Sequence, residues 1–304
     1  MTRALAVALL ACGVAHAQYA MREIDLHFHS GLEREVPMEE WIGMAAAGGR
    51  KVVLMLDHLE LYRKSADEYE QWRAKGKFQS RYSMGAAGHR EFFADVDRVA
   101  AAHQNLQIFK GWEIYEGELD TGMDLEAMKL VDAIGWHISP NNGREPPDGK
   151  TLLRRVAQVK EAQKKVPVPM ILFHPFTMRL ENIQRTAKAK GRDLKSITVA
   201  EYRFFKPGEQ QELAAALKGT SIYIEISNST AKYFEDPVCR QALIEDIRPL
   251  ADMDVQFTVS TDAHHVSDAT RPFQPETYCK ELGCTDANTS GMVRELRAAK
   301  RRRR

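Results

Sequence analysis

The stretch "IDLHFHS", residues 24–30, places His27 and His29 two positions apart at the end of an apolar run. In a β-strand, residues i and i+2 point to the same face. If the stretch is a strand, both imidazoles leave it on one side, close enough to bind one ion. Neutral imidazole is the commonest side-chain ligand for metals, but two histidines exposed at a strand end would give the same pattern. The remaining sequence has to distinguish these two interpretations.

Further short, apolar and β-branched segments follow along the chain, and helical patterns separate them. The predicted strands are Glu23–His27, Lys51–Asp57, Gln107–Glu113, Val131–His137, Pro169–His174, Ser221–Ile226 and Val255–Asp262. The predicted helices are Met38–Ala47, His89–Ala102, Leu125–Lys129, Gly149–Lys165, Gly208–Leu217 and Pro237–Leu250. This alternation predicts parallel strands joined by helical crossovers. Seven such units, with no internal repeat or low-complexity linker, favour a single-domain α/β fold, a distorted TIM-like (β/α)7 barrel.

In barrels of this kind, the chemistry lies at the C-terminal ends of the strands. Every predicted strand except the sixth ends on residue types that bind metals: His27 and His29, Asp57 and His58, Glu113, His137, His174, and Asp262 with His264. One histidine at a strand end is usually structural, but six of the ten histidines lie at these ends. The sequence therefore predicts a metal centre at one end of the barrel.

The overall composition gives no reason to expect a polyanionic partner. The formal net charge is +1, so the field of the whole molecule does not favour one. The basic end, "RAAKRRRR" at residues 297–304, is more typical of a solvated helix end than of a tail that binds nucleic acid or membrane surfaces. We therefore expect no nucleic-acid partner and, after the N-terminal segment, no transmembrane span.

The first residues, "MTRALAVALLACGVAHAQ", show the basic, apolar and small-residue order of a secretory signal peptide. We expect cleavage after Ala17 and a periplasmic or secreted protein, with lipoprotein processing at Cys12 as the alternative. The predicted organisation is a signal peptide at 1–17, a barrel at 18–285, and a C-terminal helix with a basic tail at 286–304. In an oxidising compartment Cys279 and Cys284 could form a disulfide, which the sequence leaves open.

The chain resembles the PHP (polymerase and histidinol phosphatase) family in the order of its motifs. These are "DLHFHS", "LDHLE", "GWEI", "GWHIS", "FHPF" and "STDAHH", which together extend from about Glu23 to His265. Each motif is short, but their combined order is fairly specific. The resemblance implies a distorted seven-stranded (β/α) barrel with a three-metal centre, and an activity as a phosphoesterase.

The resemblance also implies which residues bind the metals. By position they are His27, His29 and Asp262 for the first metal, His137 and His174 for the second, His58 and His264 for the third, and Glu113 as the carboxylate that bridges the first two. The family usually has one more ligand, within "SDG", where this chain has "HSGLEREVP". Glu35 is our choice for that ligand and Glu33 the reserve. This departure from the family pattern leaves the third metal open.

Mixed imidazole and carboxylate ligands suit Zn²⁺, Mn²⁺ or Fe²⁺ better than Ca²⁺, which prefers oxygen ligands alone. We therefore expect two or three such divalent ions, which would activate a water molecule for hydrolysis. Asp25 and Asp57 lie beside predicted ligands, where they would either orient the imidazoles or cap backbone groups. His265 would either donate a proton to the leaving group or support its neighbour His264.

Two long connections leave the predicted metal face, at residues 59–88 and 175–207, and both are rich in basic and aromatic residues. Such connections often form the walls or lids of a site. Guanidinium groups pair bidentately with phosphate. Arg179 and Arg271, which follow the ends of the fifth and seventh predicted strands, are therefore the predicted contacts to a substrate phosphate or carboxylate.

The sequence favours an exported, metal-dependent hydrolase that cleaves a phosphoester of a small phosphorylated molecule. One alternative is an amidohydrolase-type C–N hydrolase, whose barrels also open with H-x-H. Many of those enzymes carry a carbamylated lysine on the fourth strand, where this chain has His137 and no lysine. The other alternative is a non-catalytic binding protein on the same barrel.

Overall fold

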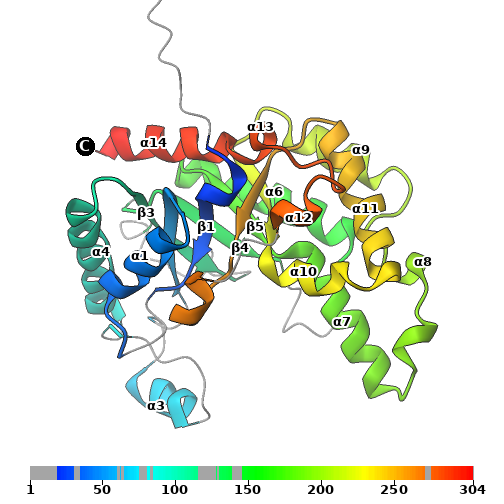
Figure 1. The fold of residues 1–304 in the computed structure, drawn as a ribbon, viewed down its shortest axis with the longest axis horizontal. Helices are drawn as coiled ribbons and strands as arrows, with labels where there is room; N and C mark the ends of the chain where they lie inside the picture. Colours follow the sequence, from blue (N-terminus) through cyan, green and yellow to red (C-terminus); the bar gives the residue numbers. More distant parts are fainter. Residues whose placement is uncertain are drawn as a thin grey trace, which may run out of the picture.

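The structure is a computed structural model that describes residues 19–30, 35–59, 62, 65–74, 81–82, 85–115, 128, 130–138, 146–270 and 275–303. Its centre is a seven-stranded sheet in which the strands follow one another in chain order (Figure 1). The strands are β1 (Ile24–Phe28), β2 (Val52–His58), β3 (Gln107–Ile114), β4 (Ala133–His137), β5 (Met170–Phe173), β6 (Ile222–Ser227) and β7 (Phe257–Ser260). Every neighbouring pair is parallel.

The first and last strands meet, so the sheet curls into a nearly closed barrel. Phe28 and Ala263 form a parallel bridge. The His29 amide donates to the Ala263 carbonyl at 3.0 Å, and the Asp262 amide donates to the His27 carbonyl at 3.0 Å. These bonds join the C-terminal ends of β1 and β7 and confirm the predicted (β/α)7 barrel.

The seven predicted strands all form, with ends within two residues of the predicted ones. Every residue of six strands is buried, and in β3 only Gln107 and Lys110 are partly exposed. Strands of a parallel barrel are covered on both faces, which makes them continuous apolar runs. A charged side chain inside such a strand therefore needs a specific partner, because burial of an unpaired charge is costly.

Helices lie around the strands (Figure 1). They are α1 (Met38–Ala47), α3 (Ala66–Ala74), α4 (Gly85–Ala102), α6 (Gly149–Lys165), α7 (Pro175–Ala189), α8 (Val199–Tyr202), α9 (Glu209–Leu217), α10 (Asn228–Phe234), α11 (Pro237–Asp252), α12 (Pro275–Tyr278), α13 (Asp286–Thr289) and α14 (Gly291–Arg303). Helices α1 and α6 have the predicted bounds, and most of the predicted helix Leu125–Lys129 lies outside the described residues.

The long connection after β5 is largely helical. Helix α7 starts at Pro175, directly after the predicted ligand His174. Proline suits the first position of a helix because its fixed φ is helical and its missing N–H would have no partner there. The connection therefore begins with a rigid element beside the predicted site, and α8 follows it.

Helix α14 crosses the barrel end at which the strands begin. Lys300 Nζ donates to the Ile108 carbonyl at 2.8 Å, and Ser221 Oγ donates to Glu295 at 3.1 Å. Arg297 Nε donates to Gln107 Oε1 at 2.7 Å. Because these contacts lie at the N-terminal ends of β3 and β6, the helix closes the end opposite the predicted metal face.

The N-terminal segment 1–18, with the predicted cleavage site and Cys12, lies outside the described residues. Cys239, Cys279 and Cys284 are buried free thiols in this structure. Among the described residues, no helix is long and apolar enough to cross a membrane.

Candidate metal centre

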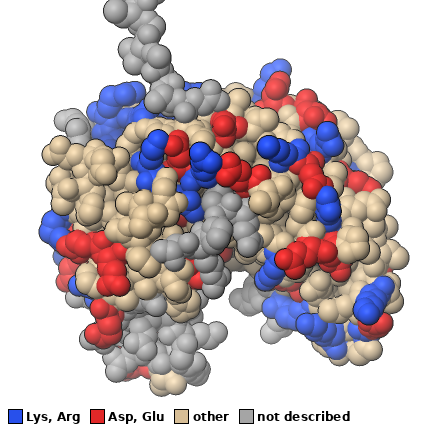
Figure 2. Space-filling view, viewed as in Figure 1, with Lys and Arg blue, Asp and Glu red and all other residues tan. Residues whose placement is uncertain are grey.

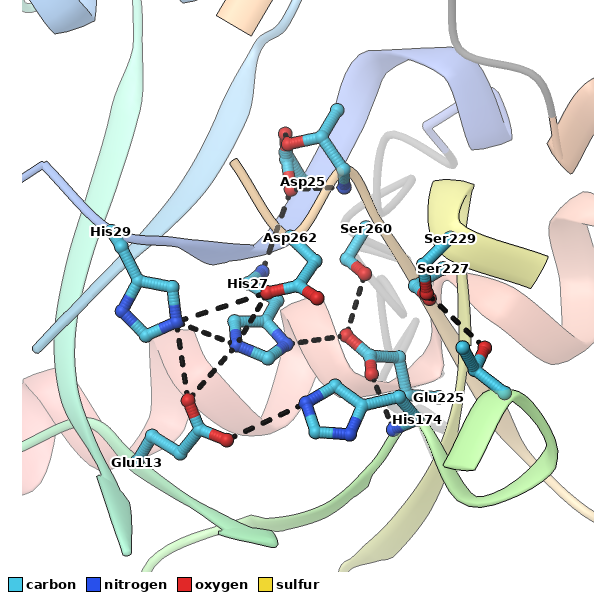
Figure 3. Close-up of polar contacts among 12 residues, drawn as sticks. Asp25, His27, His29, Glu113, His174, Glu225, Ser227, Ser229, Ser260 and Asp262 are labelled. Carbon is cyan, nitrogen blue, oxygen red and sulfur yellow. Dashed lines mark hydrogen bonds and ion pairs between the residues drawn. The ribbon is translucent and has the colours of Figure 1, made fainter. Parts of the chain in front are cut away.

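Four buried or half-buried donor atoms converge at the C-terminal ends of β1, β3 and β7 (Figure 3). His27 Nε2 lies 2.8 Å from His29 Nε2, 3.4 Å from Glu113 Oε2 and 3.3 Å from Asp262 Oδ1. His29 Nε2 lies 3.2 Å from Glu113 Oε2 and 3.9 Å from Asp262 Oδ1. In a tetrahedral zinc site with bonds of about 2.0–2.1 Å, the ligand atoms lie about 3.3 Å apart. His27 and His29 thus lie at ligand-like distances from each other and from both carboxylates.

Glu113 faces a second group of donors with its other oxygen. Its Oε1 lies 3.5 Å from His174 Nε2, and His27, Glu113 and His174 form one group whose donor atoms lie within 4.8 Å of one another. The His137 and His174 ring centroids are 4.9 Å apart. The carboxylate is therefore placed between two groups, as the predicted bridging role requires.

A third group consists of imidazoles alone. His29, His58 and His264 bring donor atoms within 4.8 Å of one another. The His29 and His58 rings are stacked at 4.5 Å between centroids, and His58 Nδ1 lies 3.5 Å from Glu113 Oε2. The structure thus brings together eight of the nine predicted ligands.

Burial and neighbouring charges hold several of these groups in the forms that bind metals, whereas at His27 and His174 burial is outweighed by the nearby carboxylates, which raise the pKa of these two imidazoles. Burial, with the nearby His174, lowers the pKa of His137 to about 3, so that its imidazole is neutral near neutral pH. Burial also lowers the pKa of His29 well below its usual value, helped by His58 and His264. Burial raises the pKa of the Glu113 carboxyl, but the surrounding imidazoles outweigh this and hold it well below its usual range. Neutral imidazole and ionised carboxylate are the ligand forms of these side chains.

Several donor atoms of the cluster lack the hydrogen bonds that buried polar atoms normally have. Both oxygens of Glu113, Asp262 Oδ1 and His29 Nδ1 have no hydrogen-bond partner among the residues that the structure describes. A buried polar group left without a partner costs about 1–3 kcal/mol, and more when it is charged. Divalent cations at the centre would supply the missing partners of the carboxylate oxygens, so the donor set fits metal ions.

Two of these residues have a backbone conformation that is rare outside glycine. His174 has φ 35° and Asp262 has φ 55°. A left-handed conformation costs roughly 1–2 kcal/mol for an ordinary residue, and such strain persists where the surroundings impose it, often at functional sites. The backbone conformation that places these two predicted ligands therefore reduces the stability of the fold.

Glu225 is a residue of this region that the sequence interpretation missed. Its Oε1 lies 2.7 Å from His27 Nδ1 and accepts a hydrogen bond from Ser260 Oγ at 2.5 Å, and its Oε2 accepts one from the His174 amide at 2.6 Å. Its signal in the sequence is a carboxylate within the otherwise uncharged, fully buried strand "IYIEIS", residues 222–227. The sixth strand thus contributes to the centre from its interior rather than from its end.

The two aspartates beside predicted ligands bind backbone groups. Asp25 accepts hydrogen bonds from the amide and hydroxyl of Thr261 at 3.0 and 2.6 Å, and from the His27 amide at 3.4 Å. Asp57 accepts one from the His58 amide at 2.8 Å and one from the Tyr62 hydroxyl. Asp25 therefore ties β1 to the segment after β7. Of the two roles expected for these aspartates, their contacts with backbone amides are those of the backbone-capping role.

Other predicted site residues lie outside the three donor groups. Glu35 is exposed just before α1 and belongs to none of the groups, and Glu33 and Arg271 lie outside the described residues. His265 is exposed, and its amide donates to Asp268 Oδ2 at 3.1 Å. Their roles as ligand, substrate contact and proton donor stay predictions.

Arg179 uses its guanidinium to hold the backbone. It donates to the carbonyls of Tyr202 at 2.9 Å, Pro147 at 2.9 Å and Glu201 at 3.0 Å. These bonds attach α7 to α8 and to the segment before α6, which gives the residue a structural role. Its predicted contact with a substrate phosphate stays a prediction.

No family model and no curated protein matches the sequence. Solved structures do match it. The histidinol phosphate phosphatase of Lactococcus lactis, in a complex with zinc, L-histidinol and phosphate, is 15% identical and gives a TM-score of 0.53, with 86% of this chain and 92% of that chain covered. The chain shares the fold of this phosphatase. A putative histidinol phosphatase of Listeria monocytogenes is 14% identical, with a TM-score of 0.51 over 84% of this chain and 100% of that one.

Proposed function

We propose that this chain is a metal-dependent phosphoesterase that hydrolyses a small phosphorylated molecule. The observation that carries the proposal is the position of Glu113, buried between donor groups on two sides, with oxygens 3.2 and 3.5 Å from His29 and His174 nitrogens. Two cations a few Å apart are the arrangement that suits in-line displacement at phosphorus. The fold shared with a phosphatase supports the same reaction class.

The chain's own residues would hold and tune the metal ions. His27, His29 and Asp262 form one donor group, Glu113 with His27 and His174 forms another, and His137 lies next to His174. When bound, Zn²⁺, Mn²⁺ or Fe²⁺ ions at such a site lower the pKa of a bound water to about 7 and stabilise developing charge on phosphate oxygens. The carboxylates would partly neutralise the cations and the imidazoles would complete their coordination, and exposed His265, next to His264, is the proposed proton donor to the leaving group.

We further propose two or three ions per chain, with the three-histidine group as the site of the third. Nitrogen-only sites favour Zn²⁺ or Fe²⁺ over Mn²⁺. A periplasmic or secreted location follows from the predicted signal peptide, which lies outside the described residues, and a phosphorylated small molecule is the substrate class that suits the metal arrangement.

The test is an activity screen of metal-reconstituted protein against phosphomonoesters, phosphodiesters and amides. We expect turnover of at least one phosphoester, its loss after chelation and its return on adding back metal. Glu113→Gln, which keeps the size and removes the charge of the bridging group, is the inactive control. Hydrolysis of amides with no turnover of any phosphoester would favour an amidohydrolase and contradict the proposal.

A further inference from the structure

Glu225 lies behind the metal cluster and joins three strands of the barrel through one carboxylate. It extends from β6, is 1% exposed, and contacts His27 of β1, Ser260 of β7 and the amide of His174 after β5 (Figure 3). A buried carboxylate is costly unless hydrogen bonds compensate it. All three contacts have hydrogen-bonding distances, so the barrel compensates the burial of this carboxylate.

The contact with His27 decides which ring nitrogen faces the cluster. An ionised carboxylate only accepts hydrogen bonds, so the proton of the His27 ring lies on Nδ1, 2.7 Å from Glu225. With the second proton displaced, as binding of a cation requires, Nε2 would carry the lone pair, and it is the atom that lies 3.3–3.4 Å from Asp262 and Glu113. A carboxylate on the second nitrogen fixes the tautomer and the orientation of a metal-binding histidine and raises its basicity.

The contact with His174 supports a strained backbone. His174 has φ 35° and precedes Pro175, and a residue before proline is disfavoured in the right-handed helical region. Its amide donates to Glu225 Oε2 at 2.6 Å. This bond holds the turn that leads from β5 into α7 and leaves His174 Nε2 3.5 Å from Glu113 Oε1.

We infer that Glu225 is a positioning residue of the metal centre, acting on the ring of His27 and on the backbone of His174 at the same time. The inference rests on the metal centre of the proposed function and not on the identity of the substrate. Ser260, which donates to the same oxygen as His27, holds the carboxylate in place without contacting His174.

The test compares the zinc affinity of Glu225→Gln with that of the wild-type protein, by competition with a chelator. The side-chain oxygen of the introduced glutamine could accept a hydrogen bond either from the His174 backbone N–H or from His27 Nδ1–H. Its NH₂ group cannot accept from the other of these two donors. We expect zinc affinity to fall by roughly ten- to a hundredfold, the usual effect of removing such a supporting group. The visible spectrum of the Co²⁺-loaded protein should change as well, because the geometry at the metal changes.

Asp246→Asn is the matched control. Asp246 is also a buried carboxylate, but it accepts hydrogen bonds from the Phe204 amide at 2.6 Å and from Arg203 at 2.7 Å and belongs to none of the donor groups. We expect this variant to lose stability and keep its zinc affinity. An equal loss of affinity in both variants would show a general effect of destabilisation and overturn the inference.

A measurement on the wild-type protein covers the case that Glu225→Gln does not fold. In zinc-loaded protein with ¹⁵N-labelled histidine, NMR should show a proton on Nδ1 of His27 and the metal at Nε2. A proton on Nε2, or no zinc bound at all, would overturn the inference. Equal zinc affinity and equal Co²⁺ spectra in Glu225→Gln and the wild-type protein would also overturn it. Wild-type protein that binds zinc but cleaves no phosphoester would contradict only the proposed function.

Discussion

Glu113 contacts histidines of all three donor groups, and its position could be predicted from the sequence. Donor residue types at the C-terminal ends of strands can be read from the chain once the strands are recognised. Glu225 could not be found in this way, because its partners come from three strands that only the closed barrel brings together. Arg179 is the opposite case. Its residue type and position predicted a contact with an anion, but in the structure its guanidinium N–H groups donate to backbone carbonyls.

The third metal group can be tested by comparing His264→Ala with Glu35→Ala. His264 belongs to the three-histidine group, whereas Glu35 is exposed and belongs to none of the groups. We expect His264→Ala to lose about one ion per chain and, because Glu35 is the predicted remaining ligand, Glu35→Ala to bind one ion more weakly, as measured by elemental analysis after reconstitution. Wild-type metal content in Glu35→Ala, with a loss in Glu33→Ala instead, would contradict the choice of Glu35, and wild-type content in His264→Ala would contradict the three-histidine site.

Replacement of Arg179 by alanine should reduce the stability of the fold. Its guanidinium donates to three backbone carbonyls, and burial lowers its pKa, which indicates a partly desolvated charge. Hydrogen bonds to charged groups are worth about 1.5–3 kcal/mol, so we expect a loss of about 2 kcal/mol in denaturant unfolding. If stability stays the same and KM for a phosphorylated substrate rises tenfold, the substrate contact is the main role.

At the scale of elements, the strands were predictable because parallel strands buried on both faces are apolar runs. The helix α7 was not predicted, although Pro175 at its first position is a helix-start signal that the sequence contains. Close packing between strands also depends on single residues. Gly135 of β4 faces Phe173 of β5, whose ring stacks on His27 at 3.7 Å between centroids.

Gly135→Ala should therefore disturb both the barrel and the centre. A Cβ at this position would collide with the Phe173 ring, which would have to move against His27. Overpacking of this kind costs typically about 1–3 kcal/mol, and we expect that loss in thermal or denaturant unfolding, together with weaker zinc binding. Gly43→Ala in α1 is the control, because nothing lies within 4 Å of a Cβ there. Equal stability of the two variants would contradict the close contact.

At the scale of the whole molecule, the barrel separates two ends with different roles. The donor groups lie where the strands end, and α14 packs where the strands begin. Charges of both signs are interspersed on the face drawn in Figure 2, in keeping with the net charge of +1. Tyr19, the first described residue, contacts α14 through a hydrogen bond of 2.7 Å from Arg297, so the described chain begins at the end opposite the metal groups.

The predicted signal peptide concerns this same end of the molecule. If it is cleaved after Ala17, the mature chain begins at Gln18, one residue before Tyr19, whose hydroxyl accepts a hydrogen bond from Arg297 of α14. N-terminal sequencing of protein from the native host should find Gln18 in the periplasmic or secreted fraction. An intact Met1 on cytoplasmic protein would contradict export, and a lipid-modified Cys12 would favour the lipoprotein alternative.

The central claim is that the converging histidines and carboxylates hold metal ions. Elemental analysis of the protein, purified without chelators and compared with Glu113→Gln, tests it most directly. We predict about two to three divalent ions of Zn, Mn or Fe per chain, as the donor groups imply, and a loss of at least one of them in Glu113→Gln. Less than one ion per chain in the wild-type protein, unchanged after incubation with these metals, would contradict the claim.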